Sequence, residues 1–79
     1  IMFVKNEIIN LIKSKTQLAD DITETTHLYK DLHFDSLTYI RFLMELENRF
    51  DIKIELAEME YCLVIGQMIE LIEKRTGRL

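Results

Sequence analysis

The sequence predicts an all-α fold, a small bundle of three main helices and one short helix with a long first loop. The chain has no proline and only two glycines among its 79 residues, so few positions break a helix. Its apolar residues recur at helical spacing, and the turn signals that strands need are missing. A chain of this length is expected to form one domain over residues 1–79, with a modest core.

The first helix is expected over residues 3–16, followed by a long loop over residues 17–35. One face of the helix is apolar, because four residues fall at i, i+4, i+7 and i+8: Val4, Ile8, Leu11 and Ile12. The loop is rich in Asp, Thr and His. Three apolar residues are expected to anchor it to the core: Ile22, Leu28 and Leu32.

The remaining helices are predicted from the same spacing. The second covers residues 36–50, with an apolar stripe expected to face the core: Leu37, Ile40, Leu43, Met44, Leu46 and Phe50. A connection over residues 51–55 leads to a short third helix near residues 56–61. The last helix covers residues 65–75 and has four inward residues: Ile65, Met68, Ile69 and Ile72. Gly77 lies just past its end, where a left-handed residue is favoured.

The net charge of −4 is unevenly spread and limits the classes of partner. Residues 20–35 carry −4 and residues 51–61 carry −3, whereas residues 36–50 are neutral. No basic face dominates, which argues against a nucleic-acid partner. A basic patch on a protein partner is favoured instead. The alternative is that scattered acids merely keep the domain in solution.

Composition also indicates a compartment. No apolar run approaches the ~20 residues that span a bilayer, so no membrane insertion is expected. No secretory signal opens the chain, and the single cysteine, Cys62, cannot form an internal disulfide. A reducing cytoplasm is therefore the expected setting, with Cys62 in the core. Met2 is interpreted as the native start, which favours a free-standing protein.

The most informative segment is Asp35-Ser36-Leu37, at the point where a polar loop becomes an amphipathic pattern. Asp35 is a good N-cap, because its carboxylate can accept hydrogen bonds from the first free backbone N–H groups. Ser36 then falls on the first helical residue, where its hydroxyl is exposed. An anion attached there lies near the positive end of the helix dipole, which suits a phosphodiester.

This segment and its flanks resemble the acyl carrier proteins, in which an Asp-Ser-Leu motif carries a phosphopantetheine arm on the serine. The resemblance covers nearly the whole chain. Leu28 and Asp31-Leu32 precede the motif, as they do in that family. Residues 44–54 are similar to the end of the family's second helix, and Val64-Ile65-Gly66 resembles the approach to its last helix.

The resemblance implies a carrier that is not itself an enzyme. A phosphopantetheinyl transferase would move the arm from coenzyme A onto Ser36, between Asp35 and Leu37, and Asp35 would contact that transferase. The arm's thiol would hold acyl intermediates as thioesters for fatty-acid, polyketide or related biosynthesis. Acyl-loading and acyl-using enzymes would be the other partners, and the protein is expected to be a monomer.

The resemblance also suggests surfaces for these partners and for the cargo. Partner docking would use the second helix and the preceding loop: Asp31, Thr38, Tyr39, Arg41, Met44, Glu45 and Glu47. An attached acyl chain would be sheltered between the helices by four residues: Leu28, Leu46, Cys62 and Met68. The alternative for these four is ordinary close packing with no opening.

Several residues depart from the family pattern. His33 stands where glycine is common, so a left-handed backbone is expected at or near it. Glu55 stands where proline is common. Thr38 and Tyr39 replace residues that are frequently acidic, and two arginines cancel the acids of the second helix: Arg41 and Arg49 against Glu45 and Glu47. These changes leave the arm's attachment intact but alter the docking surface.

Other functions remain open at this point. A peptidyl or aminoacyl carrier shares the architecture, although that family tends to show Gly-Gly-His-Ser before the helix. A helical interaction module that binds a partner helix would need no modified serine. A hydrolase site built from His33, Asp35 and Ser36 is disfavoured, because the three are crowded into one turn. His27 and His33 match no zinc spacing, and no metal site is expected.

Overall fold

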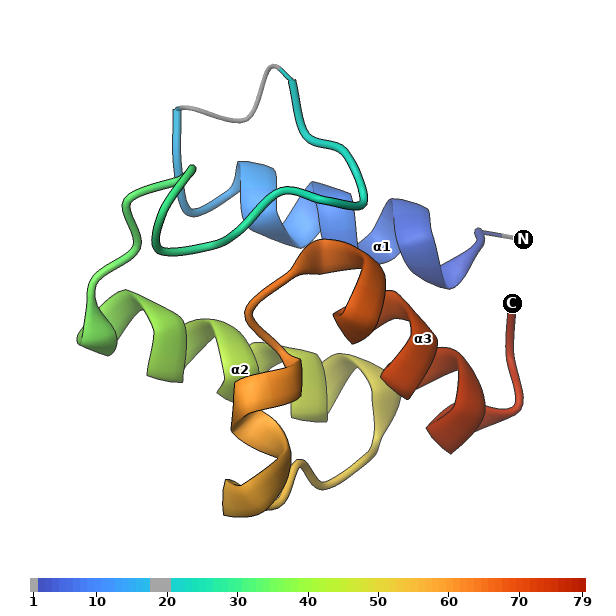
Figure 1. The fold of residues 1–79 in the computed structure, drawn as a ribbon. Helices are drawn as coiled ribbons and strands as arrows, with labels where there is room; N and C mark the ends of the chain where they lie inside the picture. The colour runs from blue at the N-terminus through green and yellow to red at the C-terminus, as the bar shows by residue number, and fades with distance from the viewer. Residues whose placement is uncertain (1, 18–20) are drawn as a thin grey trace.

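Three α-helices and one 3-10 helix form the fold in the computed structural model, which describes residues 2–17 and 21–79. In chain order they are α1 Val4–Lys13, α2 Ser36–Phe50, η1 Leu56–Tyr61 and α3 Ile65–Thr76 (Figure 1). Within these ranges the β-type pairing is one isolated bridge between His27 and Val64. The predicted all-α class is confirmed.

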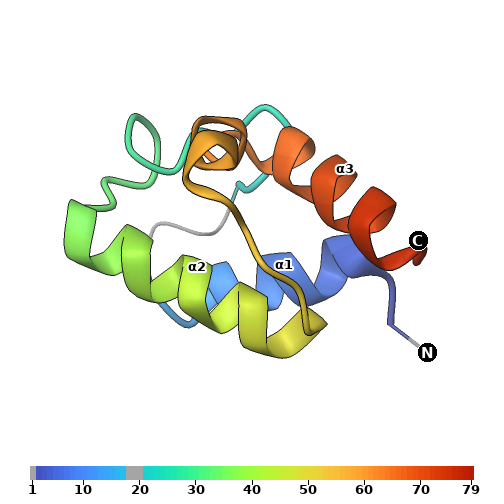
Figure 2. The ribbon, with the colours of Figure 1, turned by 90° about the horizontal axis from the view of Figure 1, so that it is seen from below.

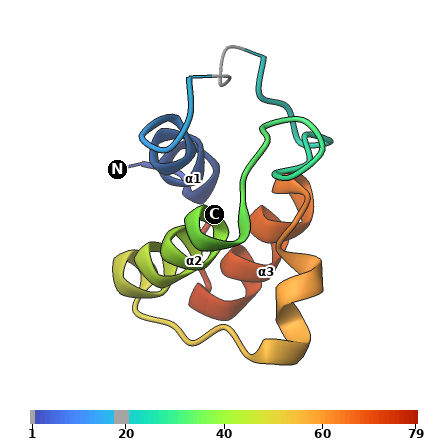
Figure 3. The same cartoon turned by 90° about the vertical axis from the view of Figure 1, so that its left-hand side faces the viewer.

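The α-helices surround one core. Figure 3 shows α1, α2 and α3 at the corners of a triangle, with η1 on the outer side of α3. Figure 2 shows the same arrangement from below, with the start of α2 at the far end from both termini. α1 packs against α2 and α3, and η1 packs against α3. The inward faces predicted for α1 and α3 are confirmed, since all eight residues are buried: Val4, Ile8, Leu11, Ile12, Ile65, Met68, Ile69 and Ile72.

α2 buries only part of its predicted stripe: Leu43, Leu46 and Phe50 confirm the prediction, and the other three positions contradict it. Its buried residues are Tyr39, Phe42, Leu43, Leu46 and Phe50. Three residues expected inside are instead exposed: Leu37 at 61%, Ile40 at 43% and Met44 at 58% of their surface. The helix carries apolar residues on two arcs, and the arc with the aromatic rings packs inward. The other arc is left facing solvent beside Ser36.

The helix ends differ little from the predicted bounds. α1 ends at Lys13 rather than at residue 16, because the Ser14 hydroxyl donates to the Leu11 carbonyl oxygen at 2.6 Å and competes with the helix pattern. α2 and η1 have the predicted bounds, and α3 runs one residue further. Gly77 takes the expected left-handed conformation at φ 70°. Asp51 does the same at the end of α2, at φ 53°, which the sequence analysis did not predict.

Residues 21–35 cross the start of α3 on their way to α2. The Leu28 N–H donates to the Leu63 carbonyl oxygen at 2.9 Å, and the Gly66 N–H donates to that of Glu24 at 2.8 Å. A Cβ at Gly66 would lie 2.9 Å from the same Glu24 oxygen, so this close approach requires glycine. The loop anchors Leu28 and Leu32 are buried, and Ile22 is half-buried. The loop is therefore fixed to the bundle just before the Asp35-Ser36 motif.

The described residues near the two ends of the chain meet beside α1. The Val4 N–H donates to the Leu79 carbonyl oxygen at 2.9 Å, and Arg78 forms an ion pair with Glu7. None of the helices in the described residues has the length and apolar character needed to cross a membrane.

Candidate functional site

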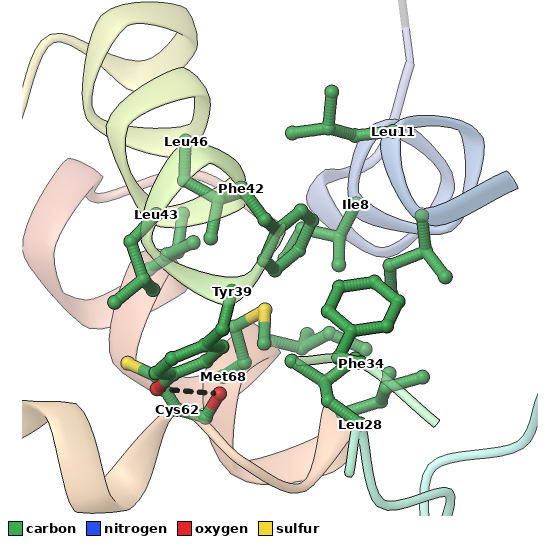
Figure 4. Close-up of a cluster of buried hydrophobic side chains, with 14 of the residues drawn as sticks. Ile8, Leu11, Leu28, Phe34, Tyr39, Phe42, Leu43, Leu46, Cys62 and Met68 are labelled. Carbon is green, nitrogen blue, oxygen red and sulfur yellow. Dashed lines mark hydrogen bonds between the residues drawn. The ribbon is translucent and has the colours of Figure 1, made fainter. Parts of the chain in front are cut away.

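The chain reaches Ser36 through a turn that is held from inside the core. His33 has φ 57°, which confirms the left-handed backbone expected there. Phe34 follows it and is buried, and its N–H donates to the Leu28 carbonyl oxygen at 3.0 Å. Its ring meets the Phe42 ring edge-on at 5.8 Å between centroids (Figure 4). Phe34 was not singled out from the sequence, yet it fixes the direction in which the next residues leave the core.

Asp35 caps α2 as predicted. Its backbone is extended at φ −95° and ψ 174°, and Oδ1 accepts a hydrogen bond from the Thr38 N–H at 2.8 Å. Its carbonyl oxygen accepts the Tyr39 N–H at 2.9 Å, which begins the helical ladder. The bond from the Thr38 N–H holds the pKa of the Asp35 carboxyl below its ordinary value. Asp35 is therefore ionised at neutral pH and directs the residue after it outward.

Ser36 is the first residue of α2 and is exposed. Its hydroxyl makes no hydrogen bond to any residue that the structure describes, and the N–H groups of Ser36 and Leu37 have no acceptor there either. The chain's other serine, Ser14, has its hydroxyl engaged at the end of α1. A phosphodiester on Ser36 would meet free N–H donors and the positive end of the α2 dipole. The residues present therefore fit a phosphopantetheine arm.

Tyr39 is the one predicted docking residue whose placement contradicts the prediction. Only 4% of its surface is exposed, and its hydroxyl donates to the Met59 carbonyl oxygen at 2.7 Å and lies 3.2 Å from that of Cys62 (Figure 4). Burial raises the pKa of the Tyr39 hydroxyl, with a further contribution from Cys62. Tyr39 joins α2 to η1 from within the core. The sequence held a signal for this, since Tyr39 lies three residues before Phe42 and seven before Leu46.

The other predicted docking residues lie at or near the surface, in different roles. Thr38 is half-exposed, and Arg41 and Met44 are exposed. Asp31 Oδ2 accepts the His27 N–H at 2.7 Å and so closes the loop turn. Two acids on α2 have internal partners. Glu45 forms an ion pair with Lys15 at 2.8 Å, and Glu47 accepts the Ile54 N–H at 2.8 Å.

The four residues predicted to shelter an acyl chain are fully buried: Leu28, Leu46, Cys62 and Met68. Figure 4 shows them in the same cluster as the aromatic rings, with Leu46 near Phe42 and the other three near Tyr39 and Phe34. Burial raises the pKa of the Cys62 thiol to about 11, so it is protonated at neutral pH. A small groove of about 130 Å³ lies at the edge of this cluster, lined by Ile40, Leu43, Met44, Glu47, Ile54 and Met59. Leu43 belongs both to the core and to this groove, so the groove borders the core.

No group of three or more His, Cys, Asp or Glu side chains is placed to hold a metal ion among residues 2–17 and 21–79. His27 instead accepts at Nδ1 from the Tyr29 N–H at 3.1 Å. In this part of the chain His27 thus has a structural role within the loop turn.

Comparison with known proteins shows what this arrangement is similar to. Residues 6–72 match the family model described as "Phosphopantetheine attachment site". The chain is 32% identical over 73 residues to an acyl carrier protein of Amoebophilus asiaticus, covering 91% of each protein. It is 32% identical over 81 aligned positions to that of Thermotoga maritima, covering 96% of this chain and all of the relative. It is 33% identical over 73 residues to that of Chlorobium phaeobacteroides, covering 91% and 94%.

Proposed function

Because this chain belongs to the family of phosphopantetheine attachment domains, with acyl carrier proteins as its relatives, we propose that Ser36 bears the arm. The function of this protein is that of an acyl carrier, and phosphopantetheine is its cofactor. The observation that supports Ser36 is the accessibility of its hydroxyl group. It is exposed at the first residue of α2 and has no partner among the described residues.

The chain's own residues would prepare this hydroxyl for modification. Asp35 holds the helix start, and Ser36 projects from it toward solvent. In the transfer from coenzyme A, a bond would form between Ser36 Oγ and the phosphorus next to the pantetheine. The bond from that phosphorus to the adenosine 3′,5′-bisphosphate leaving group would break. The Ser36 proton would pass to a base of the transferase, since this chain offers none in contact with the hydroxyl. Once attached, the arm supplies a thiol that carries acyl groups.

The partners we propose are the phosphopantetheinyl transferase and the enzymes that load and use acyl groups in fatty-acid, polyketide or related biosynthesis. They would approach the start of α2, where Ser36 and Leu37 are both exposed. Asp31 and Asp35 would face the transferase. A backbone N–H group holds each carboxylate in place, and neither forms an ion pair within the described residues.

We also propose that an acyl chain is sheltered next to Leu28, Leu46, Cys62 and Met68. Since all four are fully buried, the chain can enter only if side chains move. The groove beside Leu43 and Met59 offers a starting point, because it borders the core within one helix turn of Leu46. Methionine and cysteine are soft side chains that repack at low cost.

The test is intact-mass measurement after incubation with coenzyme A and a phosphopantetheinyl transferase of broad specificity. The wild-type protein should gain the mass of one arm, and Ser36→Ala should gain none. Ser14→Ala is the matched control, because it removes the other serine of the chain and should be modified like the wild type. A modified Ser36→Ala protein would assign the arm to another residue.

A further inference from the structure

One apolar surface is not used by the core or by the arm's attachment. It is the outward arc of α2, which we call the outer stripe and define as Leu37, Ile40, Arg41 and Met44. These residues fall at i, i+3, i+4 and i+7, so they share one side of the helix, opposite Tyr39, Phe42 and Leu46. Its three apolar side chains are between 43% and 61% exposed. It begins next to Ser36 and ends at the groove lined by Met44, Ile54 and Met59.

The charges around the outer stripe are arranged in a specific way. The two acids of α2 flank it, and each is turned to an internal partner: Glu45 to Lys15 on one side, and Glu47 to the Ile54 N–H on the other. Arg41 is the single charged residue on the stripe itself. It is exposed and forms no ion pair or hydrogen bond with the part of the chain that the structure describes, although its charge acts on the Asp35 carboxylate at the start of α2 and helps to lower the pKa of that group. The surface offered beside Ser36 is therefore apolar with one cation.

We propose that the outer stripe docks a protein partner through an apolar patch that carries a carboxylate opposite Arg41. A contact of this kind would bury Leu37, Ile40 and Met44 and pair the exposed Arg41 guanidinium. A basic patch would instead repel that guanidinium. The charge expected on the partner is therefore the opposite of the basic patch that the net charge of −4 suggested. The proposal rests on the proposed function, because an enzyme that works on an arm at Ser36 must approach this end of α2.

Local charge outweighs net charge at such a surface. At an ionic strength of 0.15 M the Debye length is about 8 Å, so a group opposite Arg41 is affected mainly by that guanidinium and its nearest neighbours. The acids of residues 51–61 include Glu58, which is paired with Arg75 on the side of η1 and α3. The partner's preference should therefore follow the residue at position 41.

The probe is a pair of synthetic amphipathic helical peptides with the same leucine face, one rimmed by glutamate and the other by lysine. Binding to the protein, with and without the arm, is measured by fluorescence anisotropy at 0.15 M salt, and amide shifts locate the contact. The acidic-rimmed peptide should bind the wild type more tightly than the basic one, and Arg41→Glu should reverse the preference by about tenfold. Lys5→Glu on α1 makes the same change in net charge on an exposed residue outside the outer stripe and should leave the preference unchanged.

Met44→Asp should weaken both peptides, and a thermal melt of each variant verifies that it is folded. The proposal is overturned if neither peptide binds, if the basic-rimmed peptide binds the wild type more tightly, or if the shifts lie away from α2. It is also overturned if the wild type self-associates in sedimentation and Met44→Asp abolishes this, since the face would then belong to a second copy. Intact mass is read separately, so a missing arm would refute the role of Ser36 without affecting the peptide result.

Discussion

Replacing Tyr39 with phenylalanine should destabilise the fold while leaving the arm site in place. The change removes a hydroxyl that donates to the Met59 carbonyl oxygen at 2.7 Å, with the Cys62 carbonyl oxygen 3.2 Å away, and keeps the ring. A hydrogen bond contributes about 0.5–1.5 kcal/mol net, and an acceptor left buried without a partner costs about 1–3 kcal/mol. We expect a loss of about 1–2 kcal/mol in the free energy of unfolding. At roughly 4–8 °C per kcal/mol for a domain of this size, the Tm should fall by about 4–16 °C.

Urea unfolding followed by far-ultraviolet circular dichroism measures the loss. Tyr29→Phe is the matched control. The centroids of the Tyr29 and Tyr39 rings are 5.4 Å apart, but the Tyr29 hydroxyl donates to no described residue. That variant should stay within about 0.5 kcal/mol of the wild type. If Tyr39→Phe also lies within that range, the hydroxyl does not join α2 to η1. If it slows arm transfer with stability unchanged, Tyr39 has the docking role first assigned to it.

The same hydroxyl predicts a pH dependence. Burial raises the pKa of Tyr39 above its ordinary value of 10.0, so the folded state keeps a proton that the unfolded state loses. The stability that this contributes is complete below pH 10 and decreases as the pH rises above it. Tyr39→Phe should lack this part of the alkaline decrease in a series of unfolding measurements.

Two further predictions concern the turn before Ser36. Asp35→Ala should lower the unfolding midpoint and slow arm transfer, whereas Asp35→Asn keeps a capping oxygen and should separate the cap from the charge. Because the pKa of Asp35 is lowered in the folded state, its contribution to the free energy of unfolding is complete above pH 3.8, the ordinary pKa. That contribution is lost as the pH falls through the pKa of the folded state. Acid unfolding that is unchanged in Asp35→Ala would contradict this. His33→Gly should be neutral or stabilising by up to ~1 kcal/mol, and His33→Val should cost about 1–2 kcal/mol, because a left-handed backbone suits glycine and excludes β-branched residues. Equal urea midpoints for the two His33 variants would refute the assigned strain.

The helix starts and ends could be predicted from single residues. Asp35 fixes the start of α2 because its carboxylate caps the Thr38 N–H, and Gly77 marks the end of α3 because it accepts positive φ. The left-handed turn at His33 was predicted through the family resemblance. The end of α1 was not, since Ser14 competes for the Leu11 carbonyl oxygen and spacing alone cannot show such a bond.

The orientation of α2 could not be chosen by apolar spacing alone. Leu37, Ile40 and Met44 form one arc, and the aromatic residues with Leu46 form another, so both satisfy the helical period. Arg41 was the available signal, because it lies within the first arc and an unpaired charge is rarely buried. A stripe that includes its position is therefore better placed in solvent. The choice also needed the packing of Phe34 on Phe42, which joins residues from the loop and the helix.

The structure also changes what the acids near Ser36 mean. Counted along the sequence, residues 20–35 and 51–61 carry −4 and −3, so acids lie in the segments before and after α2. In the folded protein Glu45 and Glu58 are each paired with a cation, Lys15 and Arg75. Asp31 and Asp35 are instead held by backbone N–H groups and form no ion pair within the described residues, and both lie on the loop side of Ser36.

Ser36 therefore lies between two different surfaces. The loop before it offers fixed carboxylates, and the outer stripe after it offers apolar side chains with Arg41. An enzyme that approaches from the loop would need basic residues, whereas one that lies along α2 would need the opposite charge. Two enzymes that act on the same arm could thus recognise different faces of one small domain, because Ser36, where the arm is attached, borders both faces. A substitution at Arg41 would then affect the second enzyme more than the first.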